Sequence, residues 1–339
     1  MNARPELYLT VSLDVEEEGL FGGQYARRGC TTANTACLER LIPLCDVGVR
    51  PTLFCAHSVL ANPASLPILA RLRDHCNAEI GAHLHHWNTP PLALPGTPEP
   101  PDTAAAVPAI AVSTELMAAK LATLMAVGRS FQGAPLTSFR MGRWDLHRAH
   151  WPLLAQAGVL ADASVRPLHC ARSPLQGPDH FDAPTAPYWA PVADKAIFEL
   201  PLTVTPLVQA LPGLLRTAPG KAGVAMRAGF RQWGALALLP VYHPLWAMRR
   251  ITSLFVARGG RVLSLTWHSS EMMPGGAPHM PDAAAVDRLL HKILSWLHWL
   301  NERYQVRCLT LDELRRAMGP TAPTPTPPAV GDWTCAPLA

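Results

Sequence analysis

Residues 51–86, PTLFCAHSVLANPASLPILARLRDHCNAEIGAHLHH, contain a complete strand–helix–strand unit. Pro51–Ala56 is a continuous apolar run typical of a buried strand, and Glu79–His83 is a second run of this kind. Between them, Ser65–Cys76 has apolar residues at helical spacing. Because strands joined through a helix usually pair in parallel, this stretch predicts a parallel sheet covered by helices.

The same alternation continues on both sides of this unit. We predict further strands at Leu7–Leu13, Leu136–Phe139, Val159–Val165, Ile197–Val204, Arg261–Trp267 and Val306–Leu309. We predict further helices at Asn34–Cys45, Ser113–Arg129, His147–Ala157, Asp282–Tyr304 and Leu311–Met318, with Asp282 as an N-cap. Seven or eight such units over about 310 residues favour a (β/α) barrel over an open doubly wound sheet. No Gly-rich phosphate loop follows a strand, which argues against nucleotide binding of that type.

Charge and proline are unevenly distributed along the 339 residues. The net charge is +4, yet Glu199 and Glu271 bracket a stretch with eight basic and no acidic residues, so the rest of the chain is net acidic. Within it, Leu207–Gly260 is expected to be either a pair of barrel helices with a solvated basic face or an insertion that touches anionic lipid or a phosphorylated carrier. Residues 319–339 are Pro/Thr-rich and predict a disordered tail after a barrel spanning 1–318.

Several classes of protein are disfavoured by the sequence. The first residues lack the basic and apolar regions of a secretory signal, and no run is long enough to span a membrane. The eight cysteines include no CxxC pair, so we expect reduced thiols and a cytoplasmic protein, with peripheral contact at the inner membrane face as an option. The basic segment contains no nucleic-acid-binding motif, and we expect no nucleic-acid partner.

Ionisable residues follow the predicted strands at several points along the chain. The ends of parallel strands meet at one rim of a barrel, so these residues should converge there. Asp14 and Glu16 are two positions apart, as are His83 and His85, and residues at that spacing on extended backbone share a face. Two imidazoles and one carboxylate form a set typical of catalytic divalent-metal sites. A chance cluster is the alternative in a chain with 14 His, and Glu17 is expected to lie in a solvated turn.

Five segments resemble the successive motifs of the polysaccharide deacetylase (NodB-homology) family, in the same order. They are SLDVEEEG, EIGAHLHHWNTPP, SFRMGRW, DASVRP and LTWHSSEMMPG. The resemblance spans Leu7 to Leu314 and is greatest to the intracellular subgroup associated with glycan and lipopolysaccharide assembly. It implies a distorted barrel of seven or eight strands. It also implies metal-dependent removal of an N-acetyl group from a sugar of a cell-envelope glycan, or of its lipid- or nucleotide-linked precursor.

The resemblance also implies roles for individual residues. Asp14 matches the general base, and Arg140 matches the arginine that orients it. His268 matches the histidine that protonates the leaving amine, and Asp162 matches an acidic position that supports this histidine. His83 matches the first metal-binding histidine.

The sequence departs from the family motifs at two metal ligands. Val15 stands where the family has a ligating Asp, and Trp87 stands where it has a second His. Glu16 and His85 are the substitutes that the spacing offers, whereas His86 should point away. A rebuilt divalent-metal site, with zinc as the expected ion, is one outcome, and a site without metal is the other.

The substrate contacts and the function leave alternatives open. Trp87 and Trp144 could stack on a sugar, Arg143 could bind an anionic group, and Glu199 could line the mouth. For each of them, packing or ion pairing within the protein is the alternative. The rival functions are another non-peptide C–N amide hydrolase on the same barrel and a catalytically inactive barrel that acts as a scaffold in glycan assembly.

Overall fold

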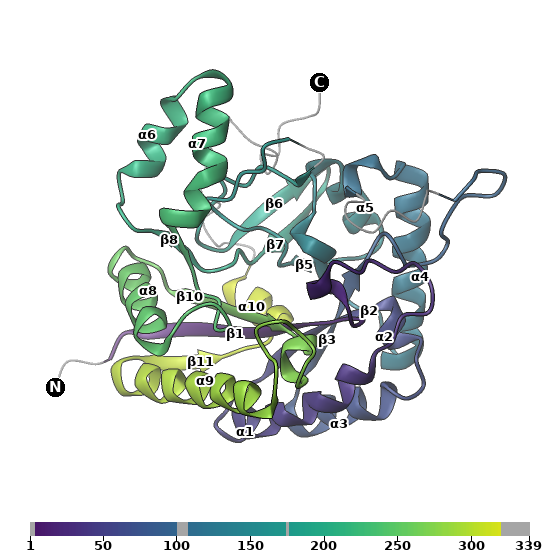
Figure 1. Ribbon diagram of the computed structural model, residues 1–339, viewed down its shortest axis with the longest axis horizontal. Coiled ribbons are helices and arrows are strands. Elements are labelled where there is room, and N and C mark those ends of the chain that lie inside the picture. Colours follow the sequence, from purple (N-terminus) through teal and green to yellow (C-terminus); the bar gives the residue numbers. More distant parts are fainter. Residues whose placement is uncertain (1–3, 100–107, 174–175, 320–339) are drawn as a thin grey trace.

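The computed structural model describes residues 4–99, 108–173 and 176–319. A mostly parallel sheet lies at its centre, and helices pack around it (Figure 1). The predicted tail lies outside the described residues from position 320 onward.

The strands of the main sheet are hydrogen-bonded in the order β10-β1-β2-β3-β4-β5-β7-β6, and β11 also pairs with β1. Their bounds are β1 (Glu6–Val15), β2 (Pro51–Ala56), β3 (Glu79–Leu84), β4 (Ser138–Met141), β5 (Ala161–Asp162), β6 (Tyr188–Val192), β7 (Lys195–Glu199), β10 (Val262–His268) and β11 (Gln305–Cys308). The pairings are parallel apart from the antiparallel hairpin of β6 and β7. Two short strands, β8 (Val204–Pro206) and β9 (Ala235–Ala237), form a separate antiparallel pair.

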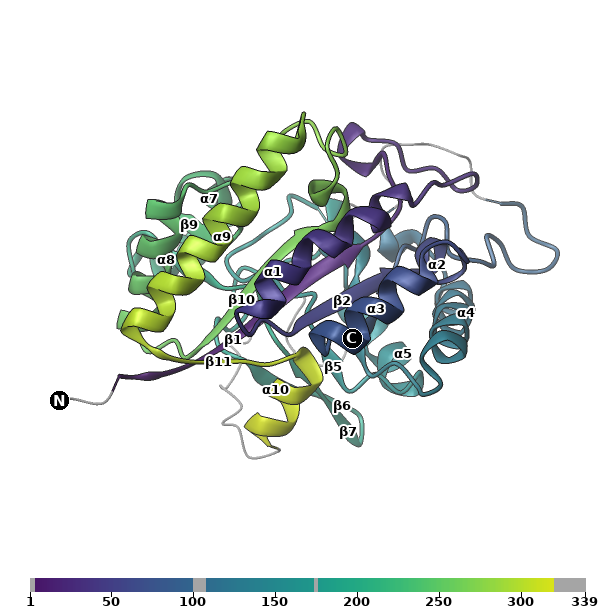
Figure 2. The same ribbon diagram turned by 90° about the horizontal axis from the view of Figure 1, so that it is seen from below.

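Helices follow most of the strands and cover the sheet. The α-helices are α1 (Ile42–Asp46), α2 (His57–Leu60), α3 (Leu66–Cys76), α4 (Thr114–Gln132), α5 (Trp151–Gln156), α6 (Leu211–Thr217), α7 (Gly220–Trp233), α8 (Leu245–Ala257), α9 (Ala283–Arg303) and α10 (Leu311–Met318). Short 3₁₀ segments are η1 (Leu20–Gly22), η2 (Ala33–Leu41), η3 (Ala109–Ala111), η4 (Gly142–Trp144), η5 (Arg148–His150) and η7 (Ser269–Met272). Helices α9, α1 and α3 lie side by side along one side of the sheet (Figures 1 and 2).

The sheet forms an incomplete barrel. No strand ladder joins β7 to β10 in the part of the chain that the structure describes. The segment after β7 bridges this gap, since Leu202 N donates to Val165 O at 3.0 Å and Ser264 N of β10 donates to Thr203 Oγ1 at 2.7 Å. The predicted distorted α/β barrel is confirmed in its parallel sheet and its helical cover.

Most of the predicted elements are present, and the differences have local causes. The predicted strand Ile197–Val204 is split into β7 and β8, with Pro201, which has no N–H to donate to a ladder, between them. The predicted helix Asn34–Cys45 is 3₁₀ up to Leu41, and an α-helix begins only at Ile42, next to Pro43. Asp282 caps α9 as predicted, because its side chain accepts from Ala285 N at 2.8 Å.

The expectation that all cysteines are reduced thiols is wrong for one pair. Cys45 at the end of α1 and Cys76 at the end of α3 form a disulfide, with their Cα atoms 5.3 Å apart. Burial of both helix ends against the same core brings the two side chains together, which sequence spacing does not reveal. Among the described helices, none has the length and apolar character needed to cross a membrane.

The basic segment Leu207–Gly260 contains α6, α7, β9 and α8, and α6 and α7 project together from one edge of the molecule (Figure 1). Some of its cations have internal partners. Arg216 pairs with Asp182, and Arg258 donates to Thr205 Oγ1 at 2.6 Å. Arg227 donates to Leu215 O at 3.1 Å, near the end of α6. Part of the positive charge therefore stabilises the segment itself.

Candidate active site

Parallel register places the ionisable residues of separate strands next to one another. In β1, Asp14 is the partner of His268 in β10. In β3, His83 is the partner of Arg140 in β4. Strands β1, β2 and β3 are successive neighbours, so these two pairs face the same barrel mouth. The structure thus brings together four residues that the sequence assigned to one site.

Glu16, His83 and His85 form a group that could hold a metal ion. One ligand atom from each lies within 4.8 Å of the others, and all three side chains are buried. His83 Nε2 and His85 Nε2 lie 3.4 and 3.2 Å from Glu16 Oε2, but neither ring nitrogen makes a hydrogen bond. A buried polar atom without a hydrogen-bond partner costs free energy. Two such nitrogen atoms that face the same carboxylate are therefore suited to bind a cation.

The charge state of Glu16 also suits a cation. Burial alone would raise the pKa of its carboxyl, but His268, His83 and His85 outweigh burial and lower this pKa. Glu16 is therefore a carboxylate at neutral pH. The spacing argument correctly placed it on the same face as Asp14.

Hydrogen bonds behind the two histidines fix their orientation. His83 Nδ1 donates to Arg140 O at 2.9 Å, and His85 Nδ1 donates to Glu17 Oε1 at 2.8 Å. Burial lowers the pKa of His85, but Glu17 and Glu16 outweigh burial and raise this pKa to about 10, so a cation bound here would have to displace the Nε2 proton of His85. In the form that has only Nδ1 protonated, each Nε2 has a lone pair directed at Glu16. This arrangement of a ligand and its supporting acceptor is common to metal-binding histidines.

The expectation of a solvated turn at Glu17 is wrong. Its side chain is buried and accepts from Asn88 Nδ2 at 2.6 Å, Ser58 Oγ at 2.9 Å and Trp87 Nε1 at 3.3 Å, in addition to His85. Although burial opposes ionisation, His85, the Glu17 backbone and Ser58 lower the pKa of Glu17 to about 2. Strand β1 ends at Val15, and the contacts of Glu17 are made with residues beyond the ends of β2 and β3.

The turn after β4 needs glycine at its first position. A Cβ atom on Gly142 would lie 2.8 Å from Leu84 O and would also collide with the His85 ring. Arg143 and Trp144 follow with φ angles of 59° and 60°, which L-residues rarely adopt. Such backbone is often found at functional sites, and here it carries Arg143 to the rim.

Arg140 holds Asp14 in place. Its Nη1 donates to Asp14 Oδ1 at 2.6 Å, and further donors bind Ser12 Oγ, Thr266 Oγ1 and Ala163 O. Burial raises the pKa of Asp14, but Arg140, His83 and His268 outweigh it, so the pKa is lowered overall. The second oxygen, Oδ2, faces His83 Nε2 at 3.9 Å and His268 Nε2 at 3.7 Å.

His268 is the partly exposed member of the group. Glu271 accepts from His268 Nδ1 at 3.0 Å and from its backbone N at 2.8 Å, and it also binds His279 Nε2 at 2.6 Å. Burial lowers the pKa of His268, but Glu16, Glu271 and Asp14 together raise it to about 10. His268 is therefore an imidazolium at neutral pH in this structure.

The expectation that Asp162 supports His268 is not met, because Glu271 takes that position. Asp162 is the register partner of Glu199 across β5 and β7, and it accepts from Ser164 Oγ at 2.6 Å. Glu199 is fully buried and accepts from Val165 N at 3.0 Å, so it does not line the mouth as expected. Burial and the Asp162 charge raise the pKa of Glu199 well above its ordinary value.

A small pocket opens beside Glu16 and His85. It measures about 150 Å³ and is lined by Glu16, Leu20, Phe21, Tyr25, His85, Trp87, Arg143 and His268. Trp87 stacks on His85 with ring centroids 4.2 Å apart, and Phe21 meets His268 edge-on at 5.0 Å. Trp144 is not in this lining, since the guanidinium groups of Arg140 and Arg166 lie against its ring at 4.7 and 5.6 Å. His86 is buried beside Trp87, away from the three candidate ligands.

Several solved structures share this fold. A Mycobacterium smegmatis protein assigned as a polysaccharide deacetylase matches with a TM-score of 0.54 and 17% identity, and 97% of each chain is covered. A Parabacteroides distasonis protein assigned as a glycoside hydrolase or deacetylase matches with a TM-score of 0.54 and 12% identity, over 93% of this chain and 72% of that chain. A 4-α-glucanotransferase from Thermococcus litoralis matches with a TM-score of 0.51 and 13% identity, over 91% of this chain and 40% of that chain. No protein-family model and no curated protein matches the sequence.

These similarities establish the fold, which is shared by proteins assigned to deacetylation and by a glucanotransferase. One fold can therefore carry different reactions, and the residues at the mouth must decide between them.

Proposed function

We propose that this chain is a metal-dependent hydrolase that removes the N-acetyl group from a sugar of a cell-envelope glycan or of its lipid- or nucleotide-linked precursor. One observation carries the proposal. The Nε2 atoms of His83 and His85 have no hydrogen-bond partner and face Glu16. The Asp14 carboxylate and the charged imidazole of His268 lie beside them. The resemblance of the sequence motifs to polysaccharide deacetylases supports the choice of reaction.

Glu16, His83 and His85 would hold the cation, and zinc suits two imidazoles and one carboxylate. A bound divalent ion supplies Lewis acidity toward a carbonyl oxygen and lowers the pKa of water. The remaining chemistry belongs to side chains of the chain itself.

Asp14 is the proposed general base, and its Oδ2 is the oxygen that would accept the proton of the attacking water. Arg140 occupies Oδ1 and keeps the carboxylate ionised. The hydroxyl of the water forms the new bond to the acetyl carbon, and the bond between this carbon and the amide nitrogen breaks. His268 donates its proton to the departing amine, so the products are acetate and a free amino sugar.

The pocket limits what can be bound next to these groups. Its volume of about 150 Å³ suits an acetamido group and part of a sugar ring, with Trp87 and Arg143 in its wall. We therefore propose substrate contact for Trp87 and Arg143. Glu199 is buried and Trp144 lies between two guanidinium groups, so neither is included.

Acetate release tests the proposed function. Purified protein loaded with zinc should release acetate from N-acetylated amino-sugar oligosaccharides, lose this activity on chelation and regain it when zinc is restored. A Glu16→Gln variant should bind zinc more weakly and lose activity in parallel. Acetate release that is indifferent to chelation would indicate an amide hydrolase without metal, and no release from any amide would indicate a scaffold.

We further propose that Leu207–Gly260 contacts anionic lipid, which would place the protein at the inner face of the membrane. Exposed large apolar side chains gather in this acid-free segment, which contains seven of the ten found in the described residues. They are Leu207, Val208, Leu214, Met226, Trp233, Tyr242 and Trp246. Exposed aromatic and aliphatic groups among arginines are typical of surfaces that bind the membrane interface.

Vesicle sedimentation tests this contact. The protein should sediment with phosphatidylglycerol vesicles and not with phosphatidylcholine vesicles, and a Trp233→Ala, Trp246→Ala double variant should sediment at least tenfold less. Arg288→Gln on α9 is the matched control outside the segment. Equal sedimentation of the double variant and the wild type would contradict the proposal.

A further inference from the structure

Three arginines near the candidate active site are near enough for the charges of two of them to lower the pKa of the third. Arg166, Arg143 and Arg231 come from the loop after β5, from η4 and from α7, respectively. None of the ion pairs found in the described residues includes any of them. Other arginines, such as Arg140 and Arg227, donate hydrogen bonds to a carboxylate or to a backbone carbonyl.

Arg166 is the central residue of this group. Its guanidinium lies against Trp144 and donates to His169 Nε2 at 3.0 Å, while its Nε is buried and has no hydrogen-bond partner. Burial, together with the charges of Arg231 and Arg143, lowers the pKa of Arg166 to about 10, against the opposing effect of Asp145. Like charges held together and partly desolvated cost free energy unless an anion is bound among them.

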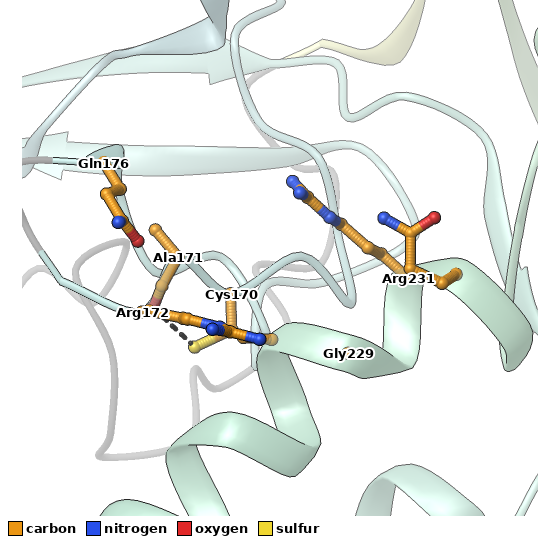
Figure 3. Close-up of a pocket in the computed structure, with 8 residues that line it drawn as sticks. Cys170, Ala171, Arg172, Gln176, Gly229 and Arg231 are labelled. Carbon is orange, nitrogen blue, oxygen red and sulfur yellow. Dashed lines mark hydrogen bonds between the residues drawn. The ribbon is translucent and has the colours of Figure 1, made fainter. Parts of the chain in front are cut away.

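A cavity lies next to this group. It measures about 420 Å³ and is bordered by Cys170, Ala171 and Arg172 on one side and by Arg231 and Gln232 at the end of α7 on the other. Figure 3 shows the Arg231 side chain extending from α7 toward the loop that carries Arg172. The wall beside them is formed by Ala228 and Gly229, and a Cβ atom on Gly229 would meet only the Trp233 Nε1 atom, at 3.9 Å. Ala228 and Gly229 thus leave open space beside the side chains of Arg172 and Arg231.

The arginines connect this cavity to the pocket beside the metal-binding group. Arg143 lines that pocket and lies over the Tyr25 ring at 5.0 Å. Trp144, the next residue, contacts Arg140 on the side of Asp14 and also contacts Arg166. A ligand whose acetamido group reaches Glu16 and His268 would therefore have its other end near Arg143 and Arg166.

We propose that Arg143, Arg166 and Arg231 form an anion subsite that binds the phosphate of a phosphorylated N-acetyl sugar. The proposal rests on the proposed function for the position of the sugar, and it narrows the substrate class to phosphate esters or diphosphates. Guanidinium groups match tetrahedral oxyanions through paired N–H donors, and three of them suit a doubly charged group. A nucleotide-linked sugar and a lipid-linked sugar share this chemistry.

Calorimetry with inorganic phosphate and pyrophosphate tests the subsite without requiring activity. The wild type should bind pyrophosphate, and Arg231→Gln should weaken binding about tenfold, since one charged hydrogen-bonding partner is lost. Arg250→Gln, an exposed arginine of the same basic segment on α8, is the matched control and should bind like the wild type. Arg231 lies on the exposed face of α7, so its replacement should not unfold the protein. Equal affinity of Arg231→Gln and the wild type, or no binding by the wild type, overturns the subsite.

Kinetics separates the subsite from the proposed function. The two substrates are N-acetylglucosamine 1-phosphate and N-acetylglucosamine. Arg231→Gln should lower the kcat/KM for the phosphorylated sugar, relative to that for the unphosphorylated sugar, about tenfold, because the KM of the phosphorylated sugar rises. Deacetylation with no preference for the phosphorylated sugar overturns the subsite alone. Pyrophosphate binding without acetate release from any sugar overturns the proposed function alone. A uridine-diphosphate sugar and a short-chain lipid diphosphate sugar, compared directly, distinguish the two sources of the phosphate.

Discussion

Two buried acidic pairs lie near Arg140, Asp14 with Glu16 and Asp162 with Glu199, and their charge states differ. Asp14 and Glu16, near the mouth, have lowered pKa values, whereas burial and Asp162 raise the pKa of Glu199 well above its ordinary value. The members of both pairs are almost fully buried, so burial alone does not explain the difference.

The neighbours of each pair account for the contrast. Three imidazoles surround Asp14 and Glu16, and each can compensate a negative charge. Glu199 accepts a hydrogen bond from Val165 N and lies beside a second carboxyl, Asp162. Like charges so close cannot both ionise at low cost, and the Arg140 charge does not outweigh this effect. Acidic side chains are therefore ionised at the mouth, where we propose a general base and a metal ligand, whereas the pair between β5 and β7 holds a proton.

Replacing Asp14 by Asn should have the largest effect. The variant keeps the shape of the side chain but cannot accept a proton, so kcat should fall about 10²–10⁴-fold. Acetate release checks this, with zinc content measured in parallel to show that the metal site is intact. Asp287→Asn, which removes an exposed carboxylate paired with Arg40, is the control, and a comparable loss there would contradict the role of Asp14.

Replacing Glu17 by Gln should weaken metal binding. His85 loses the carboxylate that fixes its ring, and losses of this kind typically reduce metal affinity about 10–100-fold. Competition with a chelating dye measures the affinity. Glu18→Gln is the neighbouring control. Among the hydrogen bonds found in the described residues, the Glu18 side chain accepts only from Asn34 N and Thr31 Oγ1, so this variant should bind zinc like the wild type.

Replacing Glu271 by Gln should move the alkaline limb of the rate profile. Glu271 is one of the carboxylates that raise the pKa of His268 to about 10, so its loss lowers that pKa. Only protonated His268 can act as the acid, so activity should be lost at a lower pH as pH rises. A profile with an unchanged alkaline limb would show that Glu271 merely supports the fold.

Replacing Glu199 by Gln should have the smallest effect, and its sign depends on pH. The folded state holds the Glu199 proton above the ordinary pKa of 4.5, so the free energy of unfolding of the wild type falls as pH rises from 4.5 toward the raised pKa. The Gln side chain is neutral at every pH, so the free energy of unfolding of the variant does not fall in this way. Denaturant unfolding at about pH 4 and about pH 8 should show the variant gaining stability relative to the wild type only at the higher pH.

The sequence predicted that Glu16, His83 and His85 converge, because these residues lie on or directly after regular strands. Glu16 and His85 follow extended strands, and a period of two is enough to place them beside Asp14 and His83. Glu17 could not be placed in this way, because its contacts with His85 and Asn88 depend on the turn that follows β1.

The remaining differences arise from contacts between distant segments. Glu199 was predicted inside a strand spanning Ile197–Val204, but β7 ends at Glu199, and its register partner in β5 is the buried Asp162. Glu271 had a local signal that was not used, since His268 and Glu271 form a capping box three residues apart at the start of η7. The cavity at Arg231 depends on α7 packing against the Cys170 loop, and no local pattern predicts that contact.

The central claim is that Glu16, His83 and His85 form the metal centre of this chain. Anomalous X-ray diffraction at the zinc absorption edge, from crystals of zinc-loaded protein, tests it most directly. We predict one strong peak between His83 Nε2, His85 Nε2 and the Glu16 carboxylate, and no such peak in crystals of the Glu16→Gln, His85→Gln variant. Zinc found only at other residues of the wild type, in protein that nevertheless releases acetate, would contradict the account.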